Sequence, residues 1–269
     1  MFTNLQYFLK RAVQAWAWLL VLPVSAAQLD IRVTDEDGRS IWARVEVRGP
    51  DGKMYQSPGS LHETMTKTRG GGPFYLGSFV MHGEATMAVP PGRYTLIAEH
   101  GLEYERVERS VEVPAQVSLT LHPWIRMREI GWWSGDMHVH HADEEAAGLA
   151  QAEDLNVSVL TNRNKLQLFK QIPWPVDPVV RVSPYHLLTI ANVEDERRGG
   201  AWILDGLRAP LELEREAGWY PPGCRYVRQA RAQRSAPGLF PWFDADMPIW
   251  WEVPVMMALD TPDSLDILH

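Results

Sequence analysis

The sequence predicts a multidomain fold, in which an all-β sandwich is followed by an α/β region that forms an incomplete (β/α) barrel. Apolar residues recur at every second position over residues 28–122, which is typical of strands that bury one face. Residues 136–161 instead read as strand, helix and strand, the repeating unit of a parallel barrel, with Asp143 as the cap of the helix. The proline-rich residues 170–186 are predicted to be a loop, and residues 187–193 a third strand. A parallel barrel needs about 200 residues or more. The chain holds fewer than that after residue 122, so we expect strands that would close the barrel to be missing and the polypeptide to be inactive if those strands carry ligands.

Residues 1–27 have the three parts of a secretory signal peptide. Lys10 and Arg11 supply the charge, residues 12–24 are apolar, and Ser25-Ala26-Ala27 are the small residues expected at a cleavage site. The alternative is an uncleaved membrane anchor, but an apolar run of about 13 residues is short for a span. We therefore expect a mature chain that starts at Gln28, is exported to the periplasm or the extracellular space, and has no stable membrane insertion after cleavage.

Residues 28–122 are predicted to form the sandwich, as an accessory domain. Turn clusters such as Asp35-Glu36-Asp37-Gly38 and Pro90-Pro91-Gly92 separate its strands. The alternating apolar residues expected in its core are Leu29/Ile31/Val33, Ala43/Val45/Val47, Tyr94/Leu96/Ala98, Val107/Val111/Val113 and Val117/Leu119/Leu121. The stretch 89–96 resembles the closing strands of the carboxypeptidase-regulatory-like sandwiches that are fused to exported enzymes. Aromatic residues near the glycine run 70–72 could bind glycan, although aromatic residues in sandwiches more often belong to the core; these are Tyr55, Phe74, Tyr75 and Phe79.

Composition excludes some partners. The 269 residues carry a formal net charge of −8 and no basic stripe, which argues against nucleic-acid binding. An apolar fraction of 45% is ample for packed cores. Cys224 is the only cysteine, so no internal disulfide can form.

The chemistry of the chain is concentrated at residues 131–141, in the sequence Gly-Trp-Trp-Ser-Gly-Asp-Met-His-Val-His-His. In an extended segment side chains alternate between faces, so His138 and His140 point the same way and can bind one metal ion. Asp136 lies on that face too, where it can be an oxygen ligand or can orient a ligating histidine. The alternative is that two histidines at this spacing arise by chance.

Three further blocks accompany this segment in order along the chain: residues 152–155, residues 193–200 and residues 246–254. Together with residues 131–140 they resemble the carbaryl-hydrolase-type metallohydrolases of the PHP (polymerase and histidinol phosphatase) superfamily. The resemblance covers roughly residues 125–269. It implies a partial PHP-like barrel over residues 123–269 with a divalent metal at the carboxyl ends of its strands.

The resemblance also implies roles for single residues. Glu194, after the apolar segment 187–193, corresponds to a metal ligand, although a lone acid there would ordinarily be solvated. His269 corresponds to a further ligand. Arg163 stands where relatives have a metal-binding histidine, and an arginine cannot coordinate a cation. We therefore expect one or two ions of zinc, manganese or iron, and Arg163 either orients the substrate or forms a surface ion pair.

Bulky aromatic residues are predicted to form the substrate pocket. Trp133 precedes the histidine strand, and Trp250 and Trp251 lie in an acidic and aromatic segment. Such a mixture suits an apolar small-molecule substrate held by a few polar groups. The alternative is that Trp250 and Trp251 lead into a core helix that begins near Pro254.

The predicted reaction is hydrolysis by metal-activated water. His138, His140, Glu194 and His269 would hold the metal, and Asp136 would orient a ligand or carry the proton. The resemblance implies ester, carbamate or amide substrates. Two alternatives remain: a PHP-type phosphoesterase, and a non-catalytic exported protein that binds glycan or envelope components.

Overall fold

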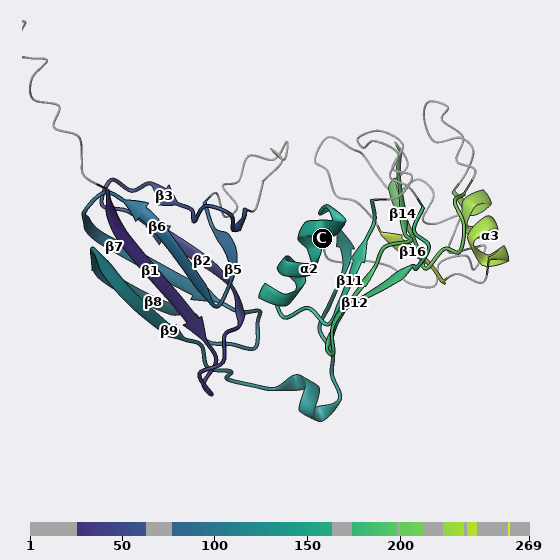
Figure 1. The fold of residues 1–269 in the computed structure, drawn as a ribbon. Helices are drawn as coiled ribbons and strands as arrows, with labels where there is room; N and C mark the ends of the chain where they lie inside the picture. Colours follow the sequence, from purple (N-terminus) through teal and green to yellow (C-terminus); the bar gives the residue numbers. More distant parts are fainter. Residues whose placement is uncertain are drawn as a thin grey trace, which may run out of the picture.

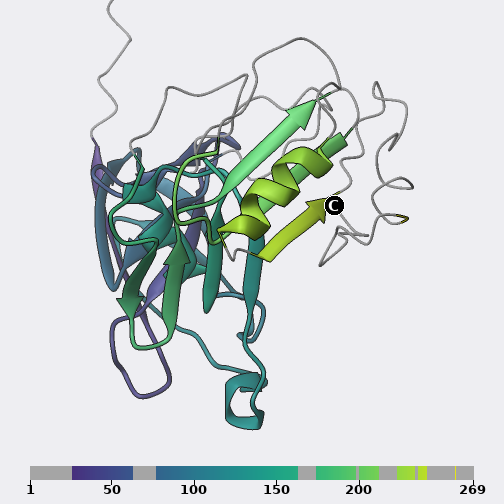
Figure 2. The same ribbon diagram turned by 90° about the vertical axis from the view of Figure 1, so that its right-hand side faces the viewer.

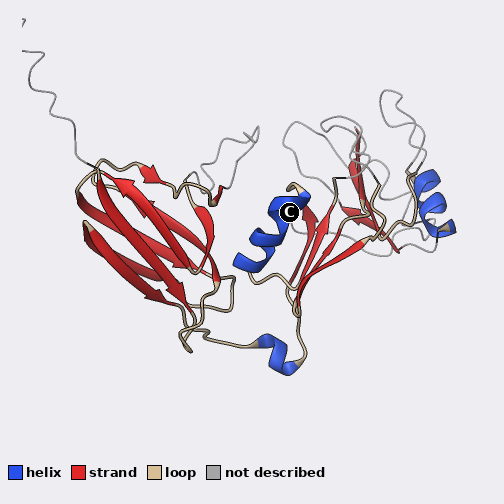
Figure 3. Cartoon of the chain, viewed as in Figure 1, coloured by secondary structure: helices blue, strands red, loops and turns tan. Residues whose placement is uncertain are grey.

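The computed structural model describes residues 26–62, 77–162, 174–197, 200–211, 223–233 and 236–240 together with residue 258. In these segments the chain is mostly β-sheet with few helices (Figure 3). The strands form a sandwich followed by a second unit, and the short helix η1 (Met127–Ile130) lies in the link between them (Figure 1). The proposed signal peptide falls on residues that lie almost wholly outside the described part.

The sandwich consists of two sheets. In one sheet β1 (Ala27–Thr34) pairs antiparallel with β6 (Glu84–Val89) and parallel with β9 (Ala115–Thr120). The other sheet has the order β4-β5-β2-β7-β8, and β3 pairs with β2. Its strands are β2 (Trp42–Arg48), β3 (Met54–Tyr55), β4 (Leu61–His62), β5 (Phe79–His82), β7 (Gly92–Glu99) and β8 (Val107–Val113).

The expected alternation of apolar residues is confirmed in the sandwich core. Leu29, Ile31, Val33 and the residues expected on β2, β7 and β9 are buried together. On β8 only Val113 is buried, while Val107 and Val111 pack at the margin of the core. Phe79 lies wholly inside this core, and Tyr55 packs edge-on against Tyr94. The described aromatic residues that were candidates for glycan binding therefore contribute to packing.

The second unit begins with the expected strand, helix and strand. Its first sheet has the order β10-β11-β13-β12 and contains β10 (Gly135–Val139), β11 (Val157–Leu160), β12 (Val179–Ser183) and β13 (His186–Thr189). The pairs β10–β11 and β11–β13 are parallel, and α2 (Asp143–Ala152) makes the crossover between β10 and β11. Ala146 and Ala150 of α2 pack on Leu160 and Leu188, so the helix covers one face of the sheet.

Three details of this unit differ from expectation. The helix begins at Asp143, but its N-cap is Ala142 rather than Asp143. Residues 170–186, predicted to be a loop from their prolines, contain β12, because Val179 and Val180 pair with Thr189 and Leu188 in a hairpin. The segment 187–193, predicted to be one strand, is interrupted at residues 190–192.

The interruption has a side-chain cause. The Nδ2 atom of Asn192 donates to the carbonyls of Leu160 and Thr189 at 3.0 and 2.8 Å, so the side-chain amide takes up carbonyls at the end of the sheet. A new strand, β14 (Val193–Arg197), starts immediately afterwards and pairs antiparallel with β15 (Gly200–Asp205), which pairs with β16 (Ala236–Phe240). The helix α3 (Cys224–Ala232) lies against β16 (Figure 2).

The described strands of the second unit therefore form a four-stranded sheet and a three-stranded sheet, and they do not close into a barrel. Within the described segments, no helix has the length and apolar character needed to cross a membrane.

The two units share a packed interface. Arg44 of β2 forms ion pairs with Glu99 at 2.8 Å and with Glu153, after α2, at 2.9 Å. The backbone nitrogen of Gly101 donates to the carbonyl of Ala152, the last residue of α2. A Cβ atom on Gly148 would approach Leu61 to 2.3 Å, so α2 lies very close to the sandwich. The sandwich thus helps to hold the crossover helix in place.

Candidate metal centre

Strand β10 brings two histidines to the same side of the four-stranded sheet. His138 is within the strand and His140 directly follows it, so the alternation of an extended chain gives both imidazoles one direction. Val139 between them points to the opposite face, where it packs with the residues of α2. The side chain of His138 is only 9% exposed, which leaves its ring inside the protein.

The third group comes from the other sheet. Glu194 is the second residue of β14, and its side chain is completely buried. Asn162 after β11 forms an isolated antiparallel bridge with Val193, and its side-chain amide donates to the carbonyl of His141. The ends of β10 and β11 and the start of β14 are therefore tied together, and this junction is what places Glu194 beside the histidines.

The donor atoms converge. The Nε2 atoms of His138 and His140 lie 2.9 Å apart, and the carboxylate oxygens of Glu194 lie 3.6 Å from the first and 2.9 Å from the second. All three donor atoms lie within 4.8 Å of one another. In a tetrahedral zinc site with bonds of about 2.1 Å, neighbouring donors are about 3.4 Å apart. The spacing fits one cation bound by two nitrogens and one oxygen, and the three residues could hold a metal ion.

An outer contact orients one of the imidazoles. The hydroxyl of Thr161, a fully buried residue, lies 3.2 Å from Nδ1 of His140 and 3.4 Å from the carbonyl of Val139. Since the Nε2 atom of the same ring faces Glu194, this contact fixes the plane of the ring. Partners of this kind are usual around metal-bound histidines.

The structure gives Asp136 a backbone contact. Its Oδ1 atom accepts a hydrogen bond from the backbone nitrogen of His138 at 2.9 Å, and the residue is exposed. Asp136 therefore stabilises the local conformation of the histidine strand. Its expected roles as a ligand orienter or proton carrier remain predictions.

Asp205, at the end of β15, is a polar residue near this centre that the sequence analysis did not single out. Burial raises the pKa of Asp205 to about 7, and the charge of nearby His138 opposes that rise. The only signal in the sequence was an acid at the end of the apolar strand 201–204, which is a common arrangement at a strand end. Its place beside the histidines depends on the pairing of β14 with β15.

The other expected site residues are not brought into this cluster. Trp133 lies on the segment before β10 and is 58% exposed. Arg163, Trp250, Trp251 and His269 lie outside the described residues, so their expected roles stay predictions.

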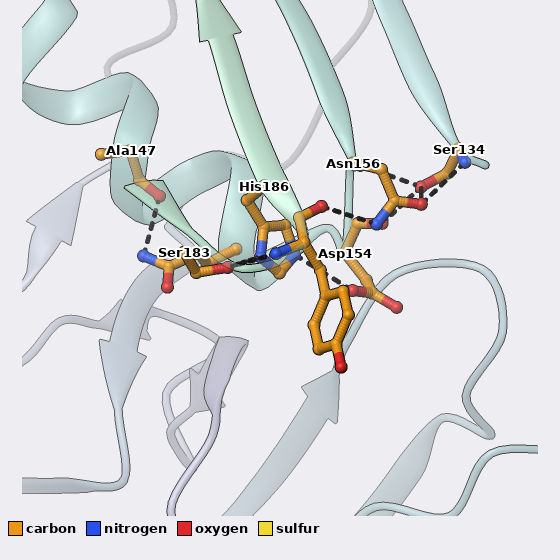
Figure 4. A network of polar contacts seen from close by, with 8 residues as sticks. Ser134, Ala147, Asp154, Asn156, Ser183 and His186 are labelled. Carbon is orange, nitrogen blue, oxygen red and sulfur yellow. Dashed lines mark hydrogen bonds and ion pairs between the residues drawn. The ribbon is translucent and has the colours of Figure 1, made fainter. Parts of the chain in front are cut away.

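A second polar network lies at the opposite end of the four-stranded sheet (Figure 4). His186 at the start of β13 joins Ser183 through Nδ1 at 2.7 Å and Asp154 through Nε2 at 3.1 Å. Asn156 links this end to Ser134 and to the carbonyl of Tyr185. Burial lowers the pKa of His100, which comes from the sandwich, and the charge of Asp154 partly opposes that effect. The hydrogen bonds of this network hold the amino ends of the strands together, and His100 of the sandwich lies close enough to sense the charge of Asp154.

Comparisons with known proteins add little to this geometry. No protein-family model matches the chain, and no curated protein matches it. Among solved structures, the chain is similar to the Bacillus anthracis TIE protein, with 17% identity and a TM-score of 0.25 over 37% of this chain and 17% of that one. It is also similar to a mutant of the pilus-presented adhesin Spy0125 (Cpa), with 13% identity and a TM-score of 0.23 over 39% of this chain and 28% of that one. Each match thus spans less than a third of the length of the similar protein.

Proposed function

We propose that this protein is an exported metal-dependent hydrolase that cleaves an ester, carbamate or amide bond in a small-molecule substrate. The observation that carries the proposal is the convergence of His138, His140 and Glu194 from two different sheets on one point. Three protein ligands are the number found in catalytic zinc sites, which keep a fourth position for water or substrate. The resemblance of the four sequence blocks to the carbaryl-hydrolase-type PHP metallohydrolases supports the same reaction.

In this proposal each residue of the centre has a single role. His138 and His140 bind the cation through Nε2, and Glu194 supplies a negative charge from a fully buried position. Thr161 keeps the ring of His140 in the orientation that this binding needs. A bound cation lowers the pKa of its water to about 7 and polarises the scissile carbonyl. Mixed imidazole and carboxylate donors suit zinc, manganese or iron.

The first test is metal binding. The purified protein is stripped with a chelator, reloaded with zinc, manganese or iron(II), dialysed, and analysed for bound metal. We expect one or two ions per chain, and a loss of at least one ion in His138→Ala and in the more conservative His138→Gln. His141→Ala is the matched control, because it removes the neighbouring imidazole, which lies outside the cluster. Wild-type protein that binds no metal would contradict the proposal.

The second test identifies the bond that is cleaved. The reloaded protein is assayed with nitrophenyl esters, an aryl carbamate, an anilide and a nitrophenyl phosphate. Turnover of the carbonyl compounds that disappears in His138→Gln and persists in His141→Ala supports the proposal. Turnover of the phosphate ester alone would favour the PHP-type phosphoesterase instead. If the chain binds metal but cleaves none of these compounds, the hydrolase assignment fails and the metal site stands.

A further inference from the structure

Asp205 shares a face with Glu194. In the pairing of β14 with β15, Glu194 stands opposite Ile203, and residues that stand opposite each other in a ladder direct their side chains to the same face. Side chains alternate between the two faces of a strand, so Asp205, two residues beyond Ile203, is directed to the same face as Ile203. It is therefore a diagonal neighbour of Glu194. Diagonal neighbours have Cα atoms about 7–8 Å apart, which is close enough for the two carboxylates to act on one site.

The backbone directly after Asp205 is tied to the segment that leads into β14. The backbone nitrogen of Gly206 donates to Oδ1 of Asn192 at 2.9 Å, and the backbone nitrogen of Leu207 donates to the carbonyl of Ala191 at 3.0 Å. Gly206 has φ +65°, a conformation that favours glycine and that turns the chain away directly after Asp205. These contacts hold the backbone at Asp205 against the segment that precedes Glu194.

Among the described residues, one oxygen of the Asp205 carboxylate has no hydrogen-bond partner. Its Oδ1 atom is buried and accepts no hydrogen bond from any residue in the described segments. A buried acceptor without a partner costs about 1–3 kcal/mol, and more when it is charged. This free-energy cost is avoided where a water molecule donates a hydrogen bond to the oxygen or a cation binds it.

Asp205 does not belong to the group of donors that lie within 4.8 Å of one another, which consists of His138, His140 and Glu194. The structure therefore does not place Asp205 among the direct ligands. A water molecule bound to the cation could bridge the cation and Asp205, because its O–H group would donate a hydrogen bond to the unpartnered Oδ1 atom.

We propose that Asp205 is an outer ligand of this metal centre, whose carboxylate accepts a hydrogen bond from a water molecule coordinated to the cation between His138, His140 and Glu194. This inference rests on the proposed function. With Glu194, Asp205 places two carboxylates around two neutral imidazoles, and their combined charge balances that of a divalent cation. Outer partners of this kind contribute about 10- to 100-fold to metal affinity.

The test measures the affinity of the stripped protein for zinc in competition with a chromophoric chelator. We expect Asp205→Asn to weaken zinc binding about 10- to 100-fold, because the amide keeps the shape of the carboxylate but loses its charge. Glu144→Gln is the matched control: it removes one negative charge at an exposed position of α2 and should leave the affinity within about twofold, as surface charges are screened.

Thermal unfolding separates this role from a purely structural one. Without metal, Asp205→Asn should melt at the same temperature as the wild type or higher, because it no longer buries an unpartnered carboxylate. With zinc, its gain in melting temperature should be smaller than that of the wild type. Equal zinc affinity in Asp205→Asn and wild type would overturn the inference and leave the proposed function intact. Wild-type protein that binds no metal would overturn both.

Discussion

The Nε2 atom of His140 lies 2.9 Å from Oε2 of Glu194, although the two residues belong to different sheets. His140 follows β10 at one edge of the four-stranded sheet, and Glu194 is in β14 of the three-stranded sheet. The junction of Asn162 with Val193 and His141 is what brings these strand ends together. The candidate metal centre is therefore also a contact between the two sheets of the second unit.

Glu194→Gln should abolish tight metal binding. The amide keeps the size of the side chain but removes the only buried negative charge among the three donors, so we expect zinc affinity to fall by more than the roughly 100-fold that outer partners reach. Competition with a chromophoric chelator measures the effect, and far-ultraviolet circular dichroism verifies the fold. Affinity within about twofold of the wild type would show that Glu194 is not a ligand.

Thr161→Val should weaken zinc binding about 10-fold without preventing it. Valine fills the same space but has no hydroxyl to contact Nδ1 of His140, so the imidazole would be less well oriented. Ser158→Ala is the control, because Ser158 lies in β11, the strand that Thr161 directly follows, and its buried hydroxyl has no hydrogen-bond partner in the described segments. Equal losses of affinity in the two variants would refute an orienting role for Thr161.

Gly101→Ala should destabilise the interface between the two units. Gly101 has φ +58°, and a Cβ atom there would lie 2.5 Å from the carbonyl oxygen of Glu153. Gly38→Ala is the control, since Gly38 also has a positive φ of +80° but has nothing within 4 Å of an added Cβ. We expect a loss of about 1 kcal/mol in Gly38→Ala from backbone strain alone. In Gly101→Ala we expect at least about 3 kcal/mol, because overpacking adds to the strain.

Chemical denaturation measures both losses. Equal destabilisation in the two variants would mean that the contact between Gly101 and Glu153 does not contribute to stability.

The free energy of unfolding should depend on His100 below neutral pH. Burial is the main cause that lowers the pKa of His100, so the folded protein keeps this ring neutral, while the unfolded chain protonates it near pH 6.5. The unfolded state then binds more protons, and stability falls as the pH drops from 6.5 towards the lowered pKa. His100→Gln should flatten this part of the profile, as measured by denaturant unfolding at several pH values.

His82→Gln is the control for that experiment, because His82 is an exposed histidine on β5. A pH profile of His100→Gln that matches the wild type would show that the buried ring does not cause the dependence.

Some parts of this protein followed from local patterns in its sequence. Leu29, Ile31 and Val33 alternate with polar residues, and this alternation correctly predicted a buried face on β1. The same reasoning predicted that His138 and His140 point one way, because side-chain direction in a strand depends only on position along the chain. The resemblance of the blocks singled out Glu194, which the pattern alone would have treated as a solvated acid.

Other parts were misjudged because they depend on pairing between distant segments. Prolines predicted a loop over residues 170–186, yet Val179 and Val180 form β12 because β13 offers them an edge to pair with. The predicted strand over residues 187–193 extends beyond the end of β13 at Thr189. The spacing of apolar residues gives no sign that the side-chain amide of Asn192 binds the carbonyl of Thr189 and ends the strand there.

The sequence by itself determined which stretches are extended, which residues are apolar enough to form the sandwich core, and which two imidazoles share a face, since these properties depend on residue type and on neighbours along the chain. Only the tertiary structure decided that Glu194 completes the centre and that Asp205 stands beside it. Both placements depend on the register of β14 with β15 and on the junction at Asn162, and such contacts are set by the balance of packing and hydrogen bonding over the whole fold.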